Sequence, residues 1–166
     1  MTDSNKADLF RHAMSRFTSA INIITTRDGA DPAGLIATSV CSLSAEPPSI
    51  LVCINKSASA HDMIINSKVF AVNLLAANQK AVAQCFYSAK GAQRFATIKW
   101  QFGINGAPIL HDSLVALECK VTEAIDGYSH TIFIGEITES ILHDDPLASC
   151  LLWHQREFAS IEMPSR

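Results

Sequence analysis

The residues best placed to do chemistry form one short segment, Asn55-Lys56-Ser57-Ala58-Ser59, between an apolar strand-like run and a helix-like run. One lysine and two hydroxyl groups beside the free N–H groups of a helix start make a suitable site for a phosphate. Ser59, with Asp62 three residues later, also matches a capping box. From these residues alone, a phosphate site and a simple capped helix are equally good interpretations.

Hydroxyl residues also occur inside the apolar run Leu35–Leu43 and just after it, at Thr38, Ser39, Ser42 and Ser44. Serine is uncommon in strands, and a buried hydroxyl costs free energy unless it forms a hydrogen bond. A strand with one solvated face would explain Ser42 and Ser44, but not the adjacent pair Thr38 and Ser39. The alternative is a strand whose polar groups face a ligand, such as a flat polar ring with a phosphate tail.

Three weaker candidates lie further along the chain. His130 follows the turn that joins the two longest predicted strands, and it is either an exposed loop residue or a hydrogen-bonding group at the mouth of a cleft. Arg94-Phe95, and Trp153 with Arg156, each pair a cation with an aromatic ring. Such pairs could clamp an adenine or a phosphate, but a surface ion pair and a core aromatic explain them equally well, and we favour that second interpretation for Arg156.

The sequence has none of the motifs that carry metal, nucleophilic or dinucleotide-fold chemistry. It contains no HExxH, no CxxC, no GxSxG, no GxGxxG and no GxxxxGK[ST]. We therefore expect no metal site, and we expect any chemistry to be supplied by an organic cofactor.

The elements that must position these residues are mostly strands. Hydrophobic periodicity predicts helices over 7–17, 60–66 and 78–87, and strands over 21–26, 35–43, 49–54, 69–75, 114–124, 131–142 and 151–158. A long loop is expected over 88–112. In the strand over 114–124, Glu118 lies on the face opposite Leu117 and Cys119. Without regular alternation of strand and helix, the pattern favours a mostly antiparallel barrel or sandwich with peripheral helices.

The composition limits the partners. The 166 residues predict a single domain over 1–166, and the charged fraction of 17% is below the ~25% that is typical of soluble domains, so we expect a homodimer that covers part of the surface. A net charge of −3 without a basic run indicates no nucleic-acid partner. Five widely spaced cysteines, no signal peptide and no membrane-length apolar run predict a soluble, reduced, cytoplasmic protein.

Taken together, the chain resembles the flavin reductase family of split β-barrel proteins over about residues 10–158. It is most similar to the short NAD(P)H:flavin oxidoreductases that serve two-component flavin monooxygenases, such as 4-hydroxyphenylacetate 3-monooxygenase. The resemblance rests on FRHAMSRFTSAINIITT, GLIATSVCSLSAEPPSILVCINKSAS, FAVNLLAANQ, Arg94-Phe95 and HTIFIGEI.

This resemblance implies a mostly β, six-stranded Greek-key split barrel of the FMN-binding type, dimeric, with FMN or FAD near the subunit interface. The residues that match flavin-contacting positions of the family are Thr38, Ser39, Val40 and Cys41 for the ring and ribityl chain, Asn55, Lys56, Ser57, Ser59 and Ala60 for the ring edge and phosphate, and Asn73, Arg94 and Phe95, which complete the pocket. The residues that it associates with the nicotinamide are His130, Trp153 and Arg156.

The function that the resemblance implies is hydride transfer from NADH or NADPH to FMN or FAD, with the reduced flavin supplied to a separate monooxygenase. Two alternatives stay open. One is a non-catalytic flavin- or haem-binding protein on the same barrel, and the other is a flavin-dependent reductase of a corrinoid or ferric complex. The hairpin that carries His130 favours an enzyme that uses a nicotinamide.

Overall fold

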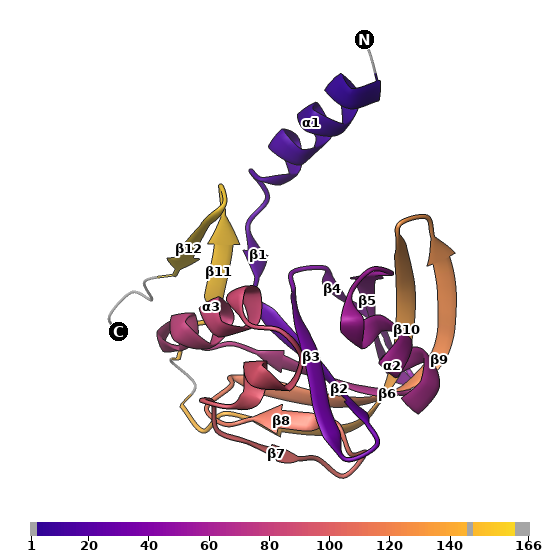
Figure 1. Cartoon of the computed structure of the whole chain (residues 1–166). Coiled ribbons are helices and arrows are strands. Elements are labelled where there is room, and N and C mark those ends of the chain that lie inside the picture. Colours follow the sequence, from indigo (N-terminus) through magenta and orange to yellow (C-terminus); the bar gives the residue numbers. More distant parts are fainter. Residues whose placement is uncertain (1–2, 146–147, 162–166) are drawn as a thin grey trace.

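The computed structural model describes residues 3–145 and 148–161. Its centre is an antiparallel sheet of seven strands in the order β3-β2-β6-β9-β10-β5-β4 (Figure 1). The strands are β2 (Asn22–Asp28), β3 (Asp31–Ala37), β4 (Val40–Ala45), β5 (Pro48–Asn55), β6 (Val69–Leu74), β9 (Val115–Gly127) and β10 (His130–Leu142). The mostly β class with peripheral helices is as expected from the sequence.

The predicted strand over 35–43 is two strands, because the chain bends at Thr38-Ser39 between β3 and β4. These consecutive strands are the two edges of the sheet, so the barrel is split between them. β3 begins at Asp31, before the run that the sequence predicted, and only Gly29-Ala30 separates β2 from β3. The bend thus places the two adjacent hydroxyl residues at the opening of the barrel.

Within the described residues, three helices and two shorter 3-10 turns lie outside the sheet. They are α1 (Asp3–Met14), α2 (Ser59–Ser67), α3 (Lys80–Ser88), η1 (Ala77–Gln79) and η2 (Gly91–Phe95). The capping box expected at Ser59 is wrong: the N-cap is Ala58, without a side-chain hydrogen bond, and Ser59 is the first helical residue. The helix ends at Lys68, whose left-handed backbone (φ 60°) lets its N–H reach the Ile64 carbonyl at 3.0 Å.

The long loop expected over 88–112 is more ordered than the sequence indicates. It contains η2 and a small hairpin of β7 (Trp100–Phe102) and β8 (Pro108–Leu110). The last predicted strand is likewise a hairpin, β11 (Leu151–His154) and β12 (Glu157–Ser160), turned by Gln155 and Arg156 in the left-handed region. β1 (Ser19–Ala20) pairs with β11, and α1 stands away from the rest of the chain (Figure 1).

Two hydrophobic clusters flank β2. One fills the barrel and includes Ile24, Phe70 and Phe133, while the other lies under α3 and includes Ile23 and Phe86. Both faces of β2 are therefore buried over its first five residues, Asn22 to Thr26. β3 lies close to this second cluster, because a Cβ built at Gly34 would be 3.1 Å from the Phe86 ring and 3.3 Å from the Phe95 ring.

The face of β9 that carries Glu118 is also covered. The Glu118 side chain is only 1% exposed, and its two carboxylate oxygens accept hydrogen bonds from the backbone N–H groups of Ile104 (3.1 Å) and Asn105 (2.7 Å). Gly103 permits this approach, since a Cβ there would be 2.5 Å from the carboxylate. The loop after β7 is thus folded around a buried carboxylate.

Candidate functional site

The split of the barrel is lined by the strand segment that the sequence singled out. The Ser39 hydroxyl donates a hydrogen bond to the Cys53 carbonyl (2.9 Å), and the Cys53 N–H donates to the Ser39 carbonyl (3.1 Å). These bonds fix the start of β4 against β5. Thr38 is exposed beside them. Val40 is half-buried and Cys41 exposed, so this stretch of chain is accessible from outside the barrel.

An apolar cavity of about 690 Å³ opens next to Thr38. Its walls come from the end of β3, from α3 and from the C-terminal hairpin, and they include Tyr87, Trp153 and Phe158. Trp153 packs edge-on against Phe158, with ring centroids 5.2 Å apart. A largely apolar space with a hydroxyl at one side suits a flat aromatic ring.

The Asn55–Ser59 segment is a tight turn closed by its own side chains. The Asn55 amide oxygen accepts hydrogen bonds from the Ser57 backbone N–H (2.9 Å) and hydroxyl (2.8 Å). The Lys56 ammonium forms an ion pair with Asp126 on β9, and the Lys56 N–H donates to the Ser129 carbonyl (3.0 Å). Lys56 therefore attaches the segment to the turn between β9 and β10.

The two serines of this segment line a second cavity, of about 590 Å³, together with Lys90 and Arg94. Arg94 donates from Nη1 to the Gly34 carbonyl (2.6 Å) and from Nε to the Ala89 carbonyl (2.9 Å), which secures η2 against β3. Burial lowers the pKa of Arg94 from its usual value. The carboxylates of Asp28 and Asp31 line the same cavity, so the groups suited to a phosphate are the hydroxyls and the two cationic side chains alone.

Lys90 is the residue of this cavity that sequence reasoning missed. It lies in the loop after α3 without a recognisable motif, and only the fold brings it to Ser57 and Ser59. The one available signal was its position four residues before Arg94.

Other predicted residues are part of the framework in this structure. Asn73 is fully buried; its amide donates to the Ile23 carbonyl (3.1 Å) and accepts from the Leu110 N–H (2.8 Å). Phe95 packs in the second cluster, and Ala60 is buried on α2. Neither cavity is lined by these three residues.

The candidates for nicotinamide contact are separated. His130 begins β10 directly opposite Asn55, and its Nδ1 is 2.9 Å from the Ser129 hydroxyl. Trp153 lines the apolar cavity, whereas Arg156 is exposed at the turn between β11 and β12 and lines neither cavity. The structure thus brings His130 to the Asn55–Ser59 segment and Trp153 to the apolar cavity.

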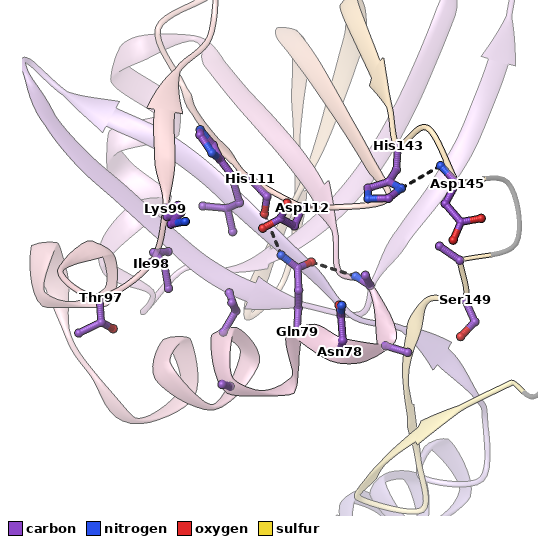
Figure 2. Close-up of a pocket in the computed structure, with 16 residues that line it drawn as sticks. Asn78, Gln79, Thr97, Ile98, Lys99, His111, Asp112, His143, Asp145 and Ser149 are labelled. Carbon is purple, nitrogen blue, oxygen red and sulfur yellow. Dashed lines mark hydrogen bonds between the residues drawn. The ribbon is translucent and has the colours of Figure 1, made fainter.

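A third cavity, of about 710 Å³, is lined by none of these predicted residues (Figure 2). Gln79 organises its wall by accepting from the Ala76 N–H and donating to the His111 carbonyl, both at 2.9 Å. His143 lies across the space from Gln79 (Figure 2). Among the described residues, no group of three or more His, Cys, Asp or Glu side chains is arranged to hold a metal ion.

The barrel, its split and the two cavities beside the split define a cofactor-binding β-barrel, and comparisons with known proteins identify its family. The family model for the flavin reductase like domain matches residues 14–162. The chain therefore belongs to the flavin reductase family, as its sequence motifs predicted.

In the part of the chain that the structure describes, no helix has the length and apolar character needed to span a membrane.

Individual relatives agree with this family. A protein of Agrobacterium fabrum (strain C58) named FMN reductase (NADH) RutF is 40% identical over 131 residues, which cover 78% of this chain and 75% of the relative. Streptomyces globisporus C-1027 NADH:FAD oxidoreductase SgcE6 superposes with a TM-score of 0.90 at 28% identity, over 98% of both chains. A nitrilotriacetate monooxygenase component B homologue from Mycobacterium thermoresistibile gives a TM-score of 0.91 at 29% identity, over 99% of this chain and 94% of that chain. These neighbours confirm the split-barrel fold class.

Proposed function

We propose that this chain is an NADH-dependent flavin reductase that supplies reduced flavin to a separate oxygenase. The observation that carries the proposal is the pair of cavities beside the barrel split, one apolar and one lined by Ser57, Ser59, Lys90 and Arg94. The names of the relatives support the same activity and the same cofactors, a flavin and NADH. The similarity to the nitrilotriacetate monooxygenase component B homologue supports the transfer of reduced flavin to a partner oxygenase.

The residues present fit a flavin. The apolar cavity beside Thr38 suits the ring system, and the two serines with Lys90 and Arg94 suit the phosphate. When bound, the flavin supplies the chemistry by accepting a hydride from the reduced nicotinamide. The protein then has to orient two rings, exclude water and stabilise negative charge, and the exposed Thr38 hydroxyl at the apolar cavity is a suitable donor for the last of these. No general base is needed for this reaction class.

His130 is proposed to contact the nicotinamide coenzyme. It is half-buried, directly opposite Asn55 on the neighbouring strand, and its Nε2 forms no hydrogen bond within the described residues. In a His130→Ala variant the KM for NADH should rise severalfold at nearly unchanged melting temperature. The matched control is His143→Ala, which removes an exposed histidine at the third cavity. A lower melting temperature without a change in KM would indicate a structural role instead.

The homodimer is proposed from the exposed apolar surface. Leu9, Phe10, Met14 and Phe17 on and after α1 are 45–65% exposed, and α1 projects away from the rest of the chain (Figure 1). Such a face is usually covered by a second subunit. We expect light scattering to give twice the mass of one 18.0 kDa chain. A cytoplasmic location belongs to the same proposal and is supported by the five free cysteines. One domain over 1–166 belongs to it as well and is supported by the single family model over residues 14–162.

The decisive experiment measures NADH and NADPH oxidation with and without FMN or FAD. The proposal requires flavin-dependent oxidation of NADH at a rate well above the flavin-free rate. Tight flavin retention without NADH oxidation would indicate a non-catalytic flavin-binding protein. Turnover only when a corrinoid or ferric complex is added would indicate a different final acceptor.

A further inference from the structure

The turn at the tip of the β9–β10 hairpin has an unusual residue at its first position (Figure 1). Gly127 pairs directly with His130, so the turn consists of Tyr128 and Ser129 alone. Tyr128 has a positive φ (63°), whereas Ser129 does not. A two-residue turn with a positive φ only at its first position is of the type II′ kind, in which that position normally holds glycine. The chain instead places a bulky aromatic residue there.

The fold gives Tyr128 nothing in return for this conformation. A positive φ brings the Cβ of an ordinary residue too close to its own backbone, which costs free energy. The Tyr128 side chain is 94% exposed. Within the described residues its ring belongs to no aromatic pair and its hydroxyl to no hydrogen bond. Residues that break a local rule without a structural gain are expected at functional sites, so we look for a ligand of this ring.

The backbone beneath Tyr128 is held by neighbouring segments. The Lys56 ammonium forms its ion pair with Asp126 on one side of the turn. The Lys56 N–H donates to the Ser129 carbonyl (3.0 Å), and the Ser129 hydroxyl lies 2.9 Å from His130 Nδ1. The ring is therefore presented on a support that is already ordered, which reduces the entropy lost when a ligand binds.

The position of the turn indicates which ligand the ring would bind. His130, with a coenzyme contact proposed through its free Nε2, is only two residues away. A nicotinamide coenzyme has two flat rings, and the nicotinamide must lie against the flavin for hydride transfer. Tyr128 lines neither cavity of the candidate flavin site. An exposed ring outside these cavities suits the other ring, adenine, because bases stack on aromatic side chains.

We propose that Tyr128 is a stacking platform for the adenine of the nicotinamide coenzyme. The inference rests on the proposed function for the contact of His130 with that coenzyme. The charges at the turn permit such binding, because the Asp126 carboxylate is paired with Lys56 and repels the coenzyme diphosphate less than a free carboxylate would. FAD carries the same base, so the test must separate the two sources.

The test compares the unaltered chain with Tyr128→Gly, which removes the ring, and Tyr128→Phe, which keeps it. With FMN as acceptor, Tyr128→Gly should raise the KM for NADH about tenfold at unchanged kcat, because only stacking on the base is lost. Tyr128→Phe should keep the original KM. Reduced nicotinamide mononucleotide, which lacks the adenosine, should have the same KM in all three proteins. Calorimetry without flavin should show the same tenfold loss of affinity for ADP-ribose, which has adenine but no nicotinamide.

Melting temperatures separate this role from a structural one. Glycine adopts a positive φ without steric cost, so Tyr128→Gly should melt no lower than the unaltered chain although it binds the coenzyme more weakly. The matched control is Lys68→Gly, which replaces another residue of positive φ (60°) at the end of α2. This control should leave the KM for NADH and the affinity for ADP-ribose unchanged.

Several results would overturn the proposal. One is an unchanged affinity for ADP-ribose in Tyr128→Gly, and another is an equal rise in KM for NADH and for the mononucleotide. Weaker FAD binding with unchanged FMN and NADH binding would assign the ring to the adenine of FAD instead. A dimer that dissociates in Tyr128→Gly with unchanged ADP-ribose binding would make the ring a contact between two copies of the chain. If the unaltered chain oxidises no NADH with either flavin, the proposed function fails, and the ADP-ribose titrations still decide the role of Tyr128.

Discussion

The Nε2 atom of His61 lies 2.8 Å from the hydroxyl of Thr131, and both side chains are buried. His61 Nδ1 is 2.7 Å from an Asp62 carboxylate oxygen, and the ring packs edge-on against Phe133, with centroids 5.5 Å apart. His61 comes shortly after the Asn55–Ser59 segment in the chain, and Thr131 directly follows His130. This one hydrogen bond therefore links the two halves of the candidate site through the interior of the protein.

Loss of this link should destabilise the fold. His61→Ala leaves the Thr131 hydroxyl without its partner, which costs about 1–3 kcal/mol of unfolding free energy. Urea unfolding of His61→Ala, Thr131→Val and the double variant should give a coupling energy of about 0.5–3 kcal/mol. Additive effects of the two substitutions would show that the hydrogen bond contributes nothing to stability.

The serines of the phosphate cavity should matter for binding rather than folding. Ser57→Ala/Ser59→Ala should weaken FMN binding about tenfold or more, because the Ser59 hydroxyl, and the Ser57 hydroxyl once it turns from Asn55, can each donate a hydrogen bond to a charged phosphate. Riboflavin, which lacks the phosphate, should bind almost as before. Since Ser59 does not cap α2, the melting temperature should change little. The control is Ser140→Ala at the exposed end of β10, and equal losses for FMN and riboflavin would contradict the assignment.

Glu118 should be a residue of structural importance that no sequence motif marks. Glu118→Ala removes the acceptor of the Ile104 and Asn105 N–H groups, at about 1–3 kcal/mol for each unsatisfied donor. Glu118→Gln keeps one acceptor oxygen and should cost less. Chemical denaturation measures both values, with Lys120→Ala as the control, because Lys120 lies on the same face of β9 but is exposed. An alanine variant as stable as the glutamine variant would refute this role.

The five free cysteines should differ in reactivity. Burial, and then the nearby Glu118 charge, raise the pKa of Cys119 to about 12, so its thiol stays protonated at neutral pH and cannot act as a nucleophile. We expect a thiol reagent at pH 8 to modify the exposed Cys41 rapidly, and Cys119 only after denaturation. Because the pKa of Cys119 is higher in the folded state, burial of its protonated thiol contributes fully to the folding free energy below the pKa of an unfolded cysteine. That contribution is lost as the pH rises toward 12. Peptide mapping by mass spectrometry would detect early modification of Cys119, which would contradict the burial.

The ion pair of Lys56 and Asp126 predicts a pH dependence of stability opposite in direction to that of Cys119. The hydrogen bond from Lys56, and then its charge, lower the pKa of Asp126. Because the pKa of Asp126 is lower in the folded state, the ion pair stabilises the fold above the unfolded-state pKa of an aspartate, about 3.9. This stabilisation is lost as the pH falls through the folded-state pKa of Asp126. Carboxyl resonances followed by NMR should show Asp126 titrating below ordinary aspartates, and Lys56→Ala should remove most of that difference, leaving the effect of the backbone hydrogen bond from Tyr128. Titration in the ordinary range would show that the pair does not form in solution.

Structural features could be predicted from the sequence where they depend on neighbouring residues, and not where they depend on contacts between segments far apart in the chain. Alternation and periodicity along the chain predicted the main strands and α2, because local burial decides them. The break at Thr38-Ser39 and the order inside 88–112 were missed, since both depend on contacts with distant segments such as Cys53 and Glu118. The phosphate serines could be named from their local segment, whereas Lys90 could not, because only the folded chain brings it to them.

The burial of both faces of β2 has a consequence for how the protein loses its structure. Ile23 and Ile24 are neighbours in the chain, yet they belong to different hydrophobic clusters. The strand cannot withdraw from one cluster without being extracted from the other, so neither half can open by itself at low free energy. The two clusters should therefore melt in one all-or-none transition, with coincident calorimetric and spectroscopic curves.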